Sequence, residues 1–334
     1  MDLSGLNSYL STLSHYLLAA VGLIAFMYGF YMFQRRIGIK REAATGRTLI
    51  VPWLAGFVIF VAFPVGASLY LSFTNYNLFK PPEWIGLQNY ADMFKDKYFW
   101  PNLRLTLFHA LLSVPLGLIF ALSIASLLAR NVRAMGFWRT LYYLPAVIPP
   151  IATILLWRWL LSPDQGLINT FLSPIYKLLN VQPLQWFTDA NLVLPSFILM
   201  SLWGVFGANT IILLAALKGV SPELYEAAGI DGAGGWAKFR FVTIPMITPA
   251  MFYNVITSII AALGIFTQSA FISAPADAGT FWNYNIYVQA FTFRKMGYAS
   301  ALGWFWLIII GVLTLFVFRS SAAWVFYEGQ QEKS

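Results

Sequence analysis

The apolar residues of this chain gather into long blocks that are separated by shorter polar stretches. A helix needs roughly 20 apolar residues to cross the hydrocarbon core of a bilayer, and these blocks reach that length. The pattern therefore predicts an all-α, polytopic membrane protein whose fold is a helical bundle. The predicted spans are residues 15–33, 49–75, 103–129, 137–161, 192–217, 246–274 and 302–326.

The composition supports lipid as the main solvent of the fold. Hydrophobic residues make up 59% of the chain and charged residues 10%, whereas a soluble domain carries about 25% charged residues. The chain has no cysteine, which excludes disulfides and thiolate chemistry. The net charge of +8 fits an excess of basic residues on cytoplasmic loops, so we expect a lipid membrane as partner and no nucleic acid.

The basic residues indicate the orientation of the spans. Most lysines and arginines follow the first, third, fifth and seventh spans, and the positive-inside rule places those loops in the cytoplasm. The N-terminus is then outside and the C-terminus is cytoplasmic. A signal peptide would carry its positive charge before the apolar stretch. Here Asp2 precedes the first span and Arg35 and Arg36 follow it, so we predict a retained anchor.

We expect the following organisation along the chain. Residues 1–48 form an anchor span and a basic cytoplasmic linker, residues 49–327 the main transmembrane domain, and residues 328–334 a cytoplasmic tail. The domain includes an outer loop, 76–101, and a long inner loop, 218–245. In the outer loop, Leu87, Tyr90, Ala91 and Phe94 recur at helical spacing, which predicts a short helix on the membrane surface or a plain amphipathic connector.

The central stretches of the spans lack Asp, Glu, Lys and Arg. Transport driven by protons or voltage needs such groups inside the membrane, and His109 is the one ionisable candidate within a span. We expect it to be a hydrogen-bonded packing residue. A phosphate-binding P-loop needs lysine after glycine, a pair that this chain lacks. Three function classes remain: a pump driven by a partner, a passive channel or facilitator, and a membrane-embedded enzyme. The last is disfavoured because the spans contain no paired carboxylates, HExxH motif or cysteine.

The inner loop 218–245 has a helix start at Ser221, Pro222 and Glu223, with serine as N-cap and proline at the first helical position. Gly229 and Gly232 then allow a turn. A second apolar cluster follows, and Pro245 is expected to close it before the next span. The sequence predicts a short helix, a glycine turn and a second helix, which either bind another protein or pack beneath their own bundle. The cluster comprises Trp236, Phe239, Phe241 and Val242.

The same loop resembles the EAA loop of importer-type ABC permeases. The matching residues are Glu226-Ala227-Ala228, Gly232 after three residues, and the segment 242–245 after nine more, with Val242 and Ile244 as conservative departures. The resemblance implies the importer-type ABC permease fold, with six core spans plus one N-terminal span. It also implies a coupling helix that docks on an ATPase subunit. The docking role passes to Glu223, Leu224, Glu226, Ala227, Ala228 and Gly232.

Four further segments resemble the carbohydrate-uptake branch of these permeases, the maltose and glycerol-phosphate type, and its first member of each permease pair. They are residues 84–90, 144–149, 166–169 and 298–302. The resemblance implies a non-catalytic subunit without a cofactor of its own in a prokaryotic inner membrane. Its expected partners are a second homologous permease, two ATPase subunits that hold ATP and Mg, and an extracytoplasmic sugar-binding protein.

A sugar is neutral and rich in hydroxyls, so amide, hydroxyl and aromatic groups can bind it without ions. The fifth and sixth spans supply such groups, and they flank the inner loop. Hydrogen bonding between helices is the alternative role for these residues. A polyol phosphate or other non-sugar solute remains an alternative substrate, although no Arg or Lys lies near the middle of the predicted pathway. The predicted pathway residues are Trp203, Phe206, Asn209, Thr210, Tyr253, Asn254, Thr257 and Ser258.

Overall fold

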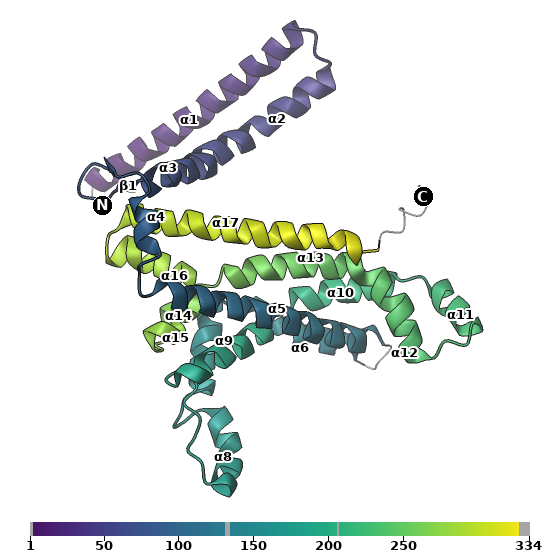
Figure 1. Ribbon diagram of the computed structural model, residues 1–334. Coiled ribbons are helices and arrows are strands. Elements are labelled where there is room, and N and C mark those ends of the chain that lie inside the picture. Colours follow the sequence, from purple (N-terminus) through teal and green to yellow (C-terminus); the bar gives the residue numbers. More distant parts are fainter. Residues whose placement is uncertain (1–2, 131–133, 206, 327–334) are drawn as a thin grey trace. The chain divides into compact units, whose positions relative to one another are not determined.

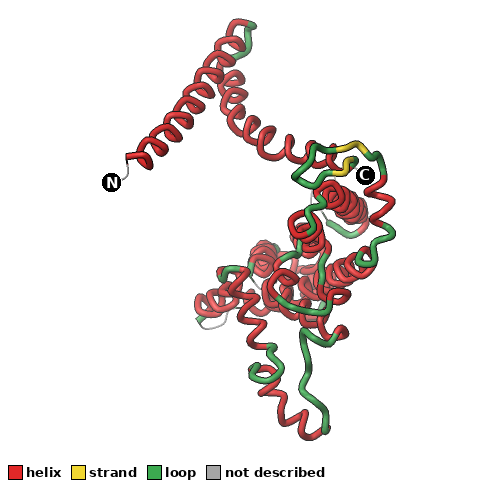
Figure 2. The backbone as a smooth tube through the Cα atoms, turned by 90° about the vertical axis from the view of Figure 1, so that its left-hand side faces the viewer, coloured by secondary structure: helices red, strands yellow, loops and turns green. Residues whose placement is uncertain are grey.

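The computed structural model describes residues 3–130, 134–205 and 207–326. Within them the regular secondary structure is helical except for one small two-stranded sheet (Figures 1 and 2). It falls into two compact units, residues 1–70 and 71–334. The predicted Phe206 and the tail 328–334 lie outside the described residues.

The first unit is a pair of long helices joined by a basic turn. Helix α1 (Leu3–Arg36) is followed by α2 (Arg41–Phe57), which continues through a π-helical turn (Val58–Ala62) into α3 (Phe63–Ser72). The polar contact between α1 and α2 joins Gln34 Nε2 to Thr48 Oγ1 at 3.2 Å. Most apolar side chains of α1 and α2 are exposed, as expected of surfaces that face lipid.

The outer loop folds against the end of α3. Strands β1 (Thr74–Asn75) and β2 (Glu83–Trp84) pair antiparallel, and α4 (Gln88–Met93) follows them. The predicted helix is thus present. Asn89 and Met93 are buried on the side that packs on protein, and Tyr90 of the predicted stripe is partly buried with them. Leu87, Ala91 and Phe94 are exposed. Asn89 lies there because its Nδ2 donates to the carbonyl oxygens of Ser72 and Thr74, at 2.8 and 2.9 Å.

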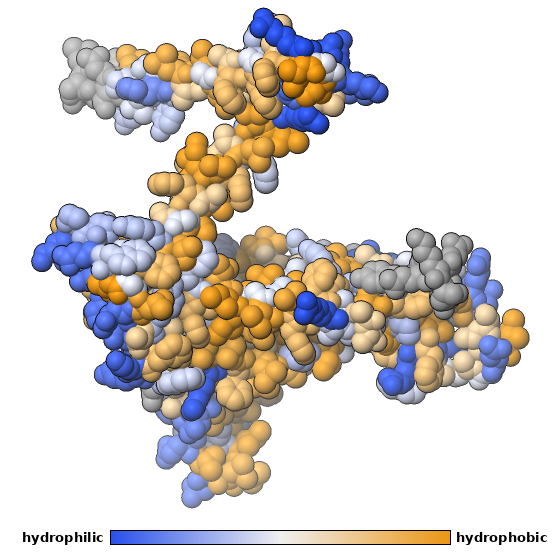
Figure 3. Space-filling model, turned by 45° about the horizontal axis from the view of Figure 1, so that its top comes forward, coloured by the Kyte–Doolittle hydropathy of each residue, from blue (hydrophilic) through white to orange (hydrophobic). Residues whose placement is uncertain are grey.

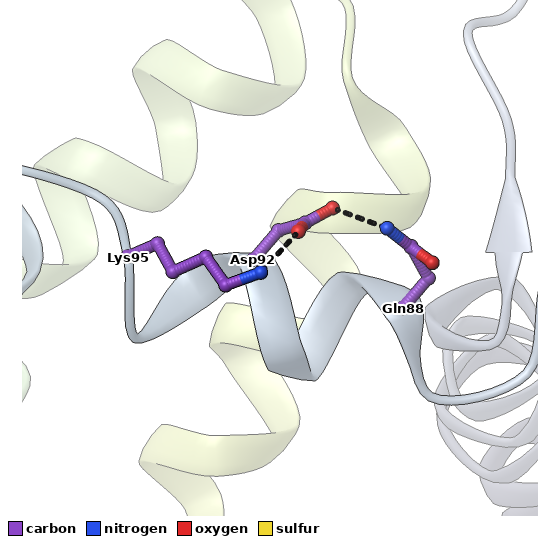
Figure 4. A network of polar contacts seen from close by, with 3 residues as sticks. All are labelled: Gln88, Asp92 and Lys95. Carbon is purple, nitrogen blue, oxygen red and sulfur yellow. Dashed lines mark hydrogen bonds and ion pairs between the residues drawn. The ribbon is translucent and has the colours of Figure 1, made fainter.

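The other side of α4 is polar and exposed. Figure 4 shows Gln88 Nε2 donating to Asp92 Oδ2 at 3.3 Å and Lys95 Nζ lying 3.9 Å from Asp92 Oδ1. An exposed ion pair of this kind contributes little stability, so the buried amide of Asn89 has the larger part in fixing the loop.

The body of the second unit is built around α5 (Phe99–Ala129). Helices α9 (Ala190–Val205), α10 (Ala208–Gly219) and α13 (Ile244–Leu263) pack on α5, and α17 (Met296–Ser320) packs on α13. Small residues allow a close approach between membrane helices, and Ala121 and Ala125 of α5 are fully buried in a cluster with Leu213 and Leu214 of α10. Figure 3 shows hydrophobic residues along the flank of this unit and hydrophilic residues toward its ends.

Two predicted spans are broken. The fourth, predicted as one helix over 137–161, consists of α6 (Met135–Val147) and α7 (Pro150–Leu160), which meet at 98°. The break follows from Pro149 and Pro150, because the residue before a proline avoids the helical region and both Ile148 and Pro149 are extended. The fifth bends by 50° between α9 and α10. Gly207 lies at this bend, where a Cβ atom would overlap the side chain of Ala146.

The sixth and seventh spans begin earlier than predicted. The sixth starts with α12 (Gly235–Lys238), runs through a π-helical turn (Phe239–Thr243) and enters α13 without a stop. Pro245 therefore does not close the inner loop, because it lies in the first turn of α13, where a missing N–H is tolerated. The seventh, α17, begins at Met296 and ends at Ser320, followed by a 3₁₀ turn (Ser321–Ala323).

The remaining elements are short. They are α8 (Leu167–Leu179), α11 (Pro222–Ile230), α14 (Thr267–Phe271), α15 (Ala276–Gly279), α16 (Trp282–Tyr287) and a π-helical turn (Val288–Thr292). In the described part of the chain, five helices are long and apolar enough to cross a membrane, or seven if each bent pair counts as one span. The upper number agrees with the seven spans predicted.

Candidate functional site

A cavity of about 400 Å³ lies between α5, α9, α10, α13 and α14. Its wall is uncharged: among the described residues, no Asp, Glu, Lys or Arg lines it. The apolar part of the lining comes from small and branched residues such as Ala208 and Ile265. The polar residues that line it are His109, Ser113, Ser201, Asn209, Thr257, Ser258 and Gln268.

Hydrogen bonds across the cavity wall connect its helices. Asn209 Nδ2 of α10 donates to Ser258 Oγ of α13 at 2.9 Å. His109 Nε2 of α5 and Ser201 Oγ of α9 are also 2.9 Å apart, which confirms that His109 is a hydrogen-bonded residue packed in the bundle. Amides, hydroxyls and an imidazole can both donate and accept hydrogen bonds. The site can therefore bind a neutral, hydroxyl-rich ligand and offers no counter-ion to a charged one.

The structure brings three of the predicted pathway residues to this cavity: Asn209, Thr257 and Ser258. Trp203 packs nearby, with its ring 6.0 Å from that of the buried Trp157 in an edge-to-face arrangement. The indole Nε1 of Trp157 has no partner among the described residues.

The structure places three other predicted residues elsewhere. Thr210 is buried and lines a separate apolar cleft of about 290 Å³ beside α6. Asn254 is buried, and its Nδ2 donates to the carbonyl of Ala250 one turn earlier on α13. Tyr253 is exposed on the outside of α13. On a helix, adjacent positions point in different directions, so the four polar residues within 253–258 cannot all face one cavity.

The lining also includes residues that were not assigned to the pathway from the sequence, namely His109, Ser113, Ser201 and Gln268. A signal for the first three existed, because each is a polar residue within an apolar span and hence a candidate to face protein or ligand. Gln268 carried the same signal, because it lies within the predicted span 246–274. It reaches the cavity because the chain breaks after α13 at Gly264 and resumes in α14.

The second candidate site is α11, at the end of the body where α10 ends and α12 begins. Its start is as predicted: Ser221 is the N-cap, Pro222 is the first helical residue, and the backbone N–H of Glu223 donates to Ser221 Oγ at 3.3 Å. Its C-cap is Asp231, and the glycine turn follows directly. Gly232 has a φ of +79°, and the N–H of Ala233 donates to the carbonyl of Ala228 at 2.8 Å, the six-to-one bond of a Schellman motif.

A polar pair joins the helix α11 to the body, and most of its described side chains are exposed. Tyr225 Oη and Thr243 Oγ1 lie 2.9 Å apart, and Thr243 is buried in the π-helical turn before α13. No described residue of α11 is buried, and Glu223, Leu224, Glu226 and Ala227 are exposed. The predicted second apolar cluster forms only in part. The rings of Trp236 and Phe239 pack in a tilted arrangement with centroids 5.6 Å apart, whereas Phe241 is exposed.

Residues 113–326 match the protein family described as "binding-protein-dependent transport system inner membrane component". The matched region includes α11 and the helices that form most of the cavity wall. It leaves out the first unit, the outer loop and His109, so the matched part of the chain carries α11 and nearly all of the cavity wall.

Several bacterial permeases resemble nearly the whole chain. A probable ABC transporter permease protein of Bacillus subtilis, YesP, is 38% identical over 300 residues, which cover 88% of this chain and 96% of the relative. The lactose transport system permease protein LacF of Rhizobium radiobacter is 30% identical over 296 residues, which cover 86% of this chain and 97% of the relative.

The fold also occurs in a solved structure. A chain of a bacterial alginate ABC transporter, determined in complex with an alginate pentasaccharide-bound periplasmic protein, superposes with a TM-score of 0.74. The likeness covers 84% of this chain and 95% of the other at 24% sequence identity. It shows that the importer-type permease fold predicted from the sequence is the fold of this chain.

Proposed function

Because the chain belongs to the family of binding-protein-dependent transport system inner membrane components, we propose that it forms half of the pathway of an ATP-driven sugar importer. The observation that carries the proposal is the connection between an uncharged polar cavity and the exposed helix α11. The cavity wall includes Asn209 and Ser258, and α11 lies between them in the chain.

The proposed direction of force runs from α11 to the cavity. An ATPase subunit grips the exposed residues of α11, centred on Glu226 and Ala227, and ATP binding moves this helix. The movement reaches α10 through the short connection to Ser221. It reaches α13 through the pair Tyr225–Thr243, whose oxygens are 2.9 Å apart. Both helices carry cavity residues, so displacement of α11 changes the shape of the site.

ATP hydrolysis belongs to the partner ATPase chains in this proposal, and ATP and Mg bind there. The chain itself supplies walls, hydrogen bonds and a mechanical joint. A second homologous permease supplies the other half of the pathway, and an extracytoplasmic binding protein delivers the substrate. The N-terminus faces outside, and α11 and the C-terminus face the cytoplasm, in line with the positive-inside distribution of Lys and Arg.

A neutral sugar is the substrate class that the cavity supports best. A phosphate or carboxylate transferred from water needs a counter-charge in a low-dielectric site, and the lining offers none among the described residues. Relatives named for lactose, diacetylchitobiose and trehalose or maltose transport agree with a neutral sugar. One relative is named for sn-glycerol-3-phosphate transport, so a phosphorylated polyol is the competing substrate in the test below.

The docking part of the proposal is tested by copurification. Glu226→Lys reverses an exposed charge on α11 and is expected to reduce recovery of the ATPase subunit with the tagged permease at least tenfold. Lys95→Glu, a charge reversal at the exposed end of the outer loop, is the control and should leave recovery unchanged. Full recovery and full transport with Glu226→Lys would remove α11 from the coupling role.

The transport part is tested in proteoliposomes that contain the complete complex and the binding protein. Uptake of radiolabelled neutral mono- and oligosaccharides is compared with uptake of glycerol phosphate, with and without ATP inside the vesicles. The proposal expects accumulation of a neutral sugar only with ATP. Equal uptake without ATP would identify a passive channel, and preference for glycerol phosphate would refute the neutral-sugar assignment.

A further inference from the structure

Helix α8 is strongly amphipathic, and its apolar face is exposed in the described part of the chain. Phe171 and Leu178 are each 84% exposed. On a helix of 3.6 residues per turn, the exposed apolar residues fall on one continuous side, and the polar residues and Lys177 fall on the other. The exposed apolar residues are Leu167, Phe171, Ile175, Leu178 and Leu179.

The polar face of α8 is fastened to the protein through Asn169, which is buried. Its Nδ2 donates to the carbonyl oxygens of Pro163 and Leu184, each at 3.0 Å. Its Oδ1 accepts from Tyr176 Oη at 3.0 Å and from Trp186 Nε1 at 2.8 Å. One amide thus joins the start of α8, its last turn and the segment that returns to α9, so the orientation of the helix is fixed.

The two ends of α8 are fixed as well. Gly166 precedes its first residue, and a Cβ atom there would overlap backbone atoms of Ser162 and Leu160. Asn180 ends it in the left-handed conformation, with a φ of 52°. The apolar face is therefore a rigid surface, and its exposure does not come from a loose loop.

The length and position of α8 exclude a membrane span. Its 13 residues extend only about 20 Å as a helix, against about 30 Å of hydrocarbon. Figures 1 and 2 show α8 projecting from the body across the direction of α5, α13 and α17. It joins α7 to α9, so it lies at the end of the body opposite to α11, which follows α10.

We propose that α8 lies in the plane of the membrane, with its apolar face against lipid acyl chains of the outer leaflet and Lys177 at the level of the lipid phosphates. Lipid is the occupant that the observations favour. Helix α8 contacts α7, whose Trp159 is exposed, so the apolar face adjoins the flank of the body, which faces lipid in an inner-membrane protein. The choice of the outer leaflet rests on the proposed function, whereas the lipid contact does not.

The role that follows is to position the outer end of the pathway. Trp186, which Asn169 holds, accepts a hydrogen bond at its carbonyl from Ser196 Oγ of α9 at 2.9 Å. A helix held at the lipid interface therefore fixes the height of the first turns of α9, and α9 carries Ser201 to the cavity.

The test uses the complete complex in nanodiscs and exploits the absence of cysteine from the chain. Single variants Phe171→Cys, Leu178→Cys, Ser173→Cys and Lys177→Cys are spin-labelled, and their relaxation is measured with oxygen, which partitions into lipid, and with a water-soluble nickel chelate. Ile308→Cys on the exposed side of α17 is the reference for lipid, and Lys95→Cys the reference for water.

We expect the ratio of oxygen accessibility to nickel-chelate accessibility at positions 171 and 178 to be at least threefold higher than at positions 173 and 177. Higher nickel accessibility at 171 and 178 would place the face in water. Protection of these positions from both reagents would show that a protein chain covers it. Either result overturns the proposal and leaves the importer assignment standing, because the measurement depends on neither ATP nor sugar.

Discussion

Asn209 of α10 and Ser258 of α13 are joined by a hydrogen bond of 2.9 Å at the wall of the cavity, although 48 residues lie between them in the chain. Those residues include all of α11. Helix α11 is thus connected to the cavity on two sides. It follows α10, which carries Asn209, and it precedes α13, which carries Ser258. Among the described residues no charged side chain lines the cavity, and this hydrogen bond is lost when the two helices move apart.

We expect loss of this bond to raise the half-saturation concentration for sugar uptake, with little change in the free energy of unfolding. Asn209→Ala and Ser258→Ala remove the same interaction, so the double variant should cost less than the sum of the single ones. A hydrogen bond between membrane helices couples two residues by about 0.6 kcal/mol on average. A double-mutant cycle on the half-saturation concentration for uptake measures the coupling, and strict additivity would contradict the link.

The control for that cycle is Ser123→Ala. Ser123 is exposed on α5, and its Oγ donates only to the carbonyl of Ile119 one turn earlier at 2.7 Å. Uptake and stability should stay within error of the parent protein, which separates a specific effect at the cavity from a general effect of removing a hydroxyl in a span.

Gly297 in the first turn of α17 allows the outer loop to pack against that helix. A Cβ atom at Gly297 would collide with the carbonyl oxygen of Thr74, and the N–H of Gly297 donates to the carbonyl of Tyr76 at 3.1 Å. We expect Gly297→Ala to lower the free energy of unfolding by about 1–3 kcal/mol, because backbone must move to make room.

Gly303 on the same helix is the matched control, since nothing lies within 4 Å of the position where its Cβ would be. Gly303→Ala should be neutral or stabilising, because alanine is the better helix former by up to about 1 kcal/mol. Thermal unfolding of the purified complex, followed by tryptophan fluorescence, compares the two variants. Equal unfolding midpoints for the two variants would show that the backbone at Thr74 can move without destabilising the protein.

The end of α11 gives a third prediction. Gly232→Ala places a side chain at a φ of +79°, where an L-residue is strained by roughly 1 kcal/mol, and should loosen the C-cap that sets the direction of the chain after α11. We expect sugar-stimulated ATP hydrolysis by the complex to fall severalfold while basal hydrolysis is retained. Gly234→Ala is the control, because Gly234 has a φ of −72° and open space around it.

The sequence was sufficient to predict the elements whose signals are local. The span at α5, the N-cap at Ser221 and the glycine turn at Gly232 depend on apolar length or on the intrinsic preferences of serine, proline and glycine, and the structure has them where predicted. Apolar length alone could not predict the 98° break between α6 and α7. There the extended conformations imposed by two adjacent prolines outweigh continuous hydrophobicity.

The candidate site was only partly predictable, because facing a cavity is a property of several helices together. Asn209 and Ser258 were identified as polar residues in apolar spans, and both line the cavity. Asn254 and Thr210 were identified by the same signal, but they are buried away from this cavity. Periodicity describes which residues share a side of one helix. It does not say which side meets α5. That choice is made by the small residues Ala121 and Ala125 of α5, which allow α10 to approach closely.

The amide of Asn169 gives a last prediction, in graded form. Asn169→Ala removes both donors and the shared acceptor, leaving Trp186 Nε1, Tyr176 Oη and two carbonyls without their partner. Each buried polar group left unpaired costs about 1–3 kcal/mol, although water can reach part of this segment.

Tyr176→Phe removes one of the four bonds and leaves the others. Limited proteolysis of the segment between α7 and α9 should therefore accelerate strongly with Asn169→Ala and only slightly with Tyr176→Phe. The order follows from the number of groups orphaned, so equal rates for the two variants would mean that the segment is held by its apolar contacts and that the amide is dispensable.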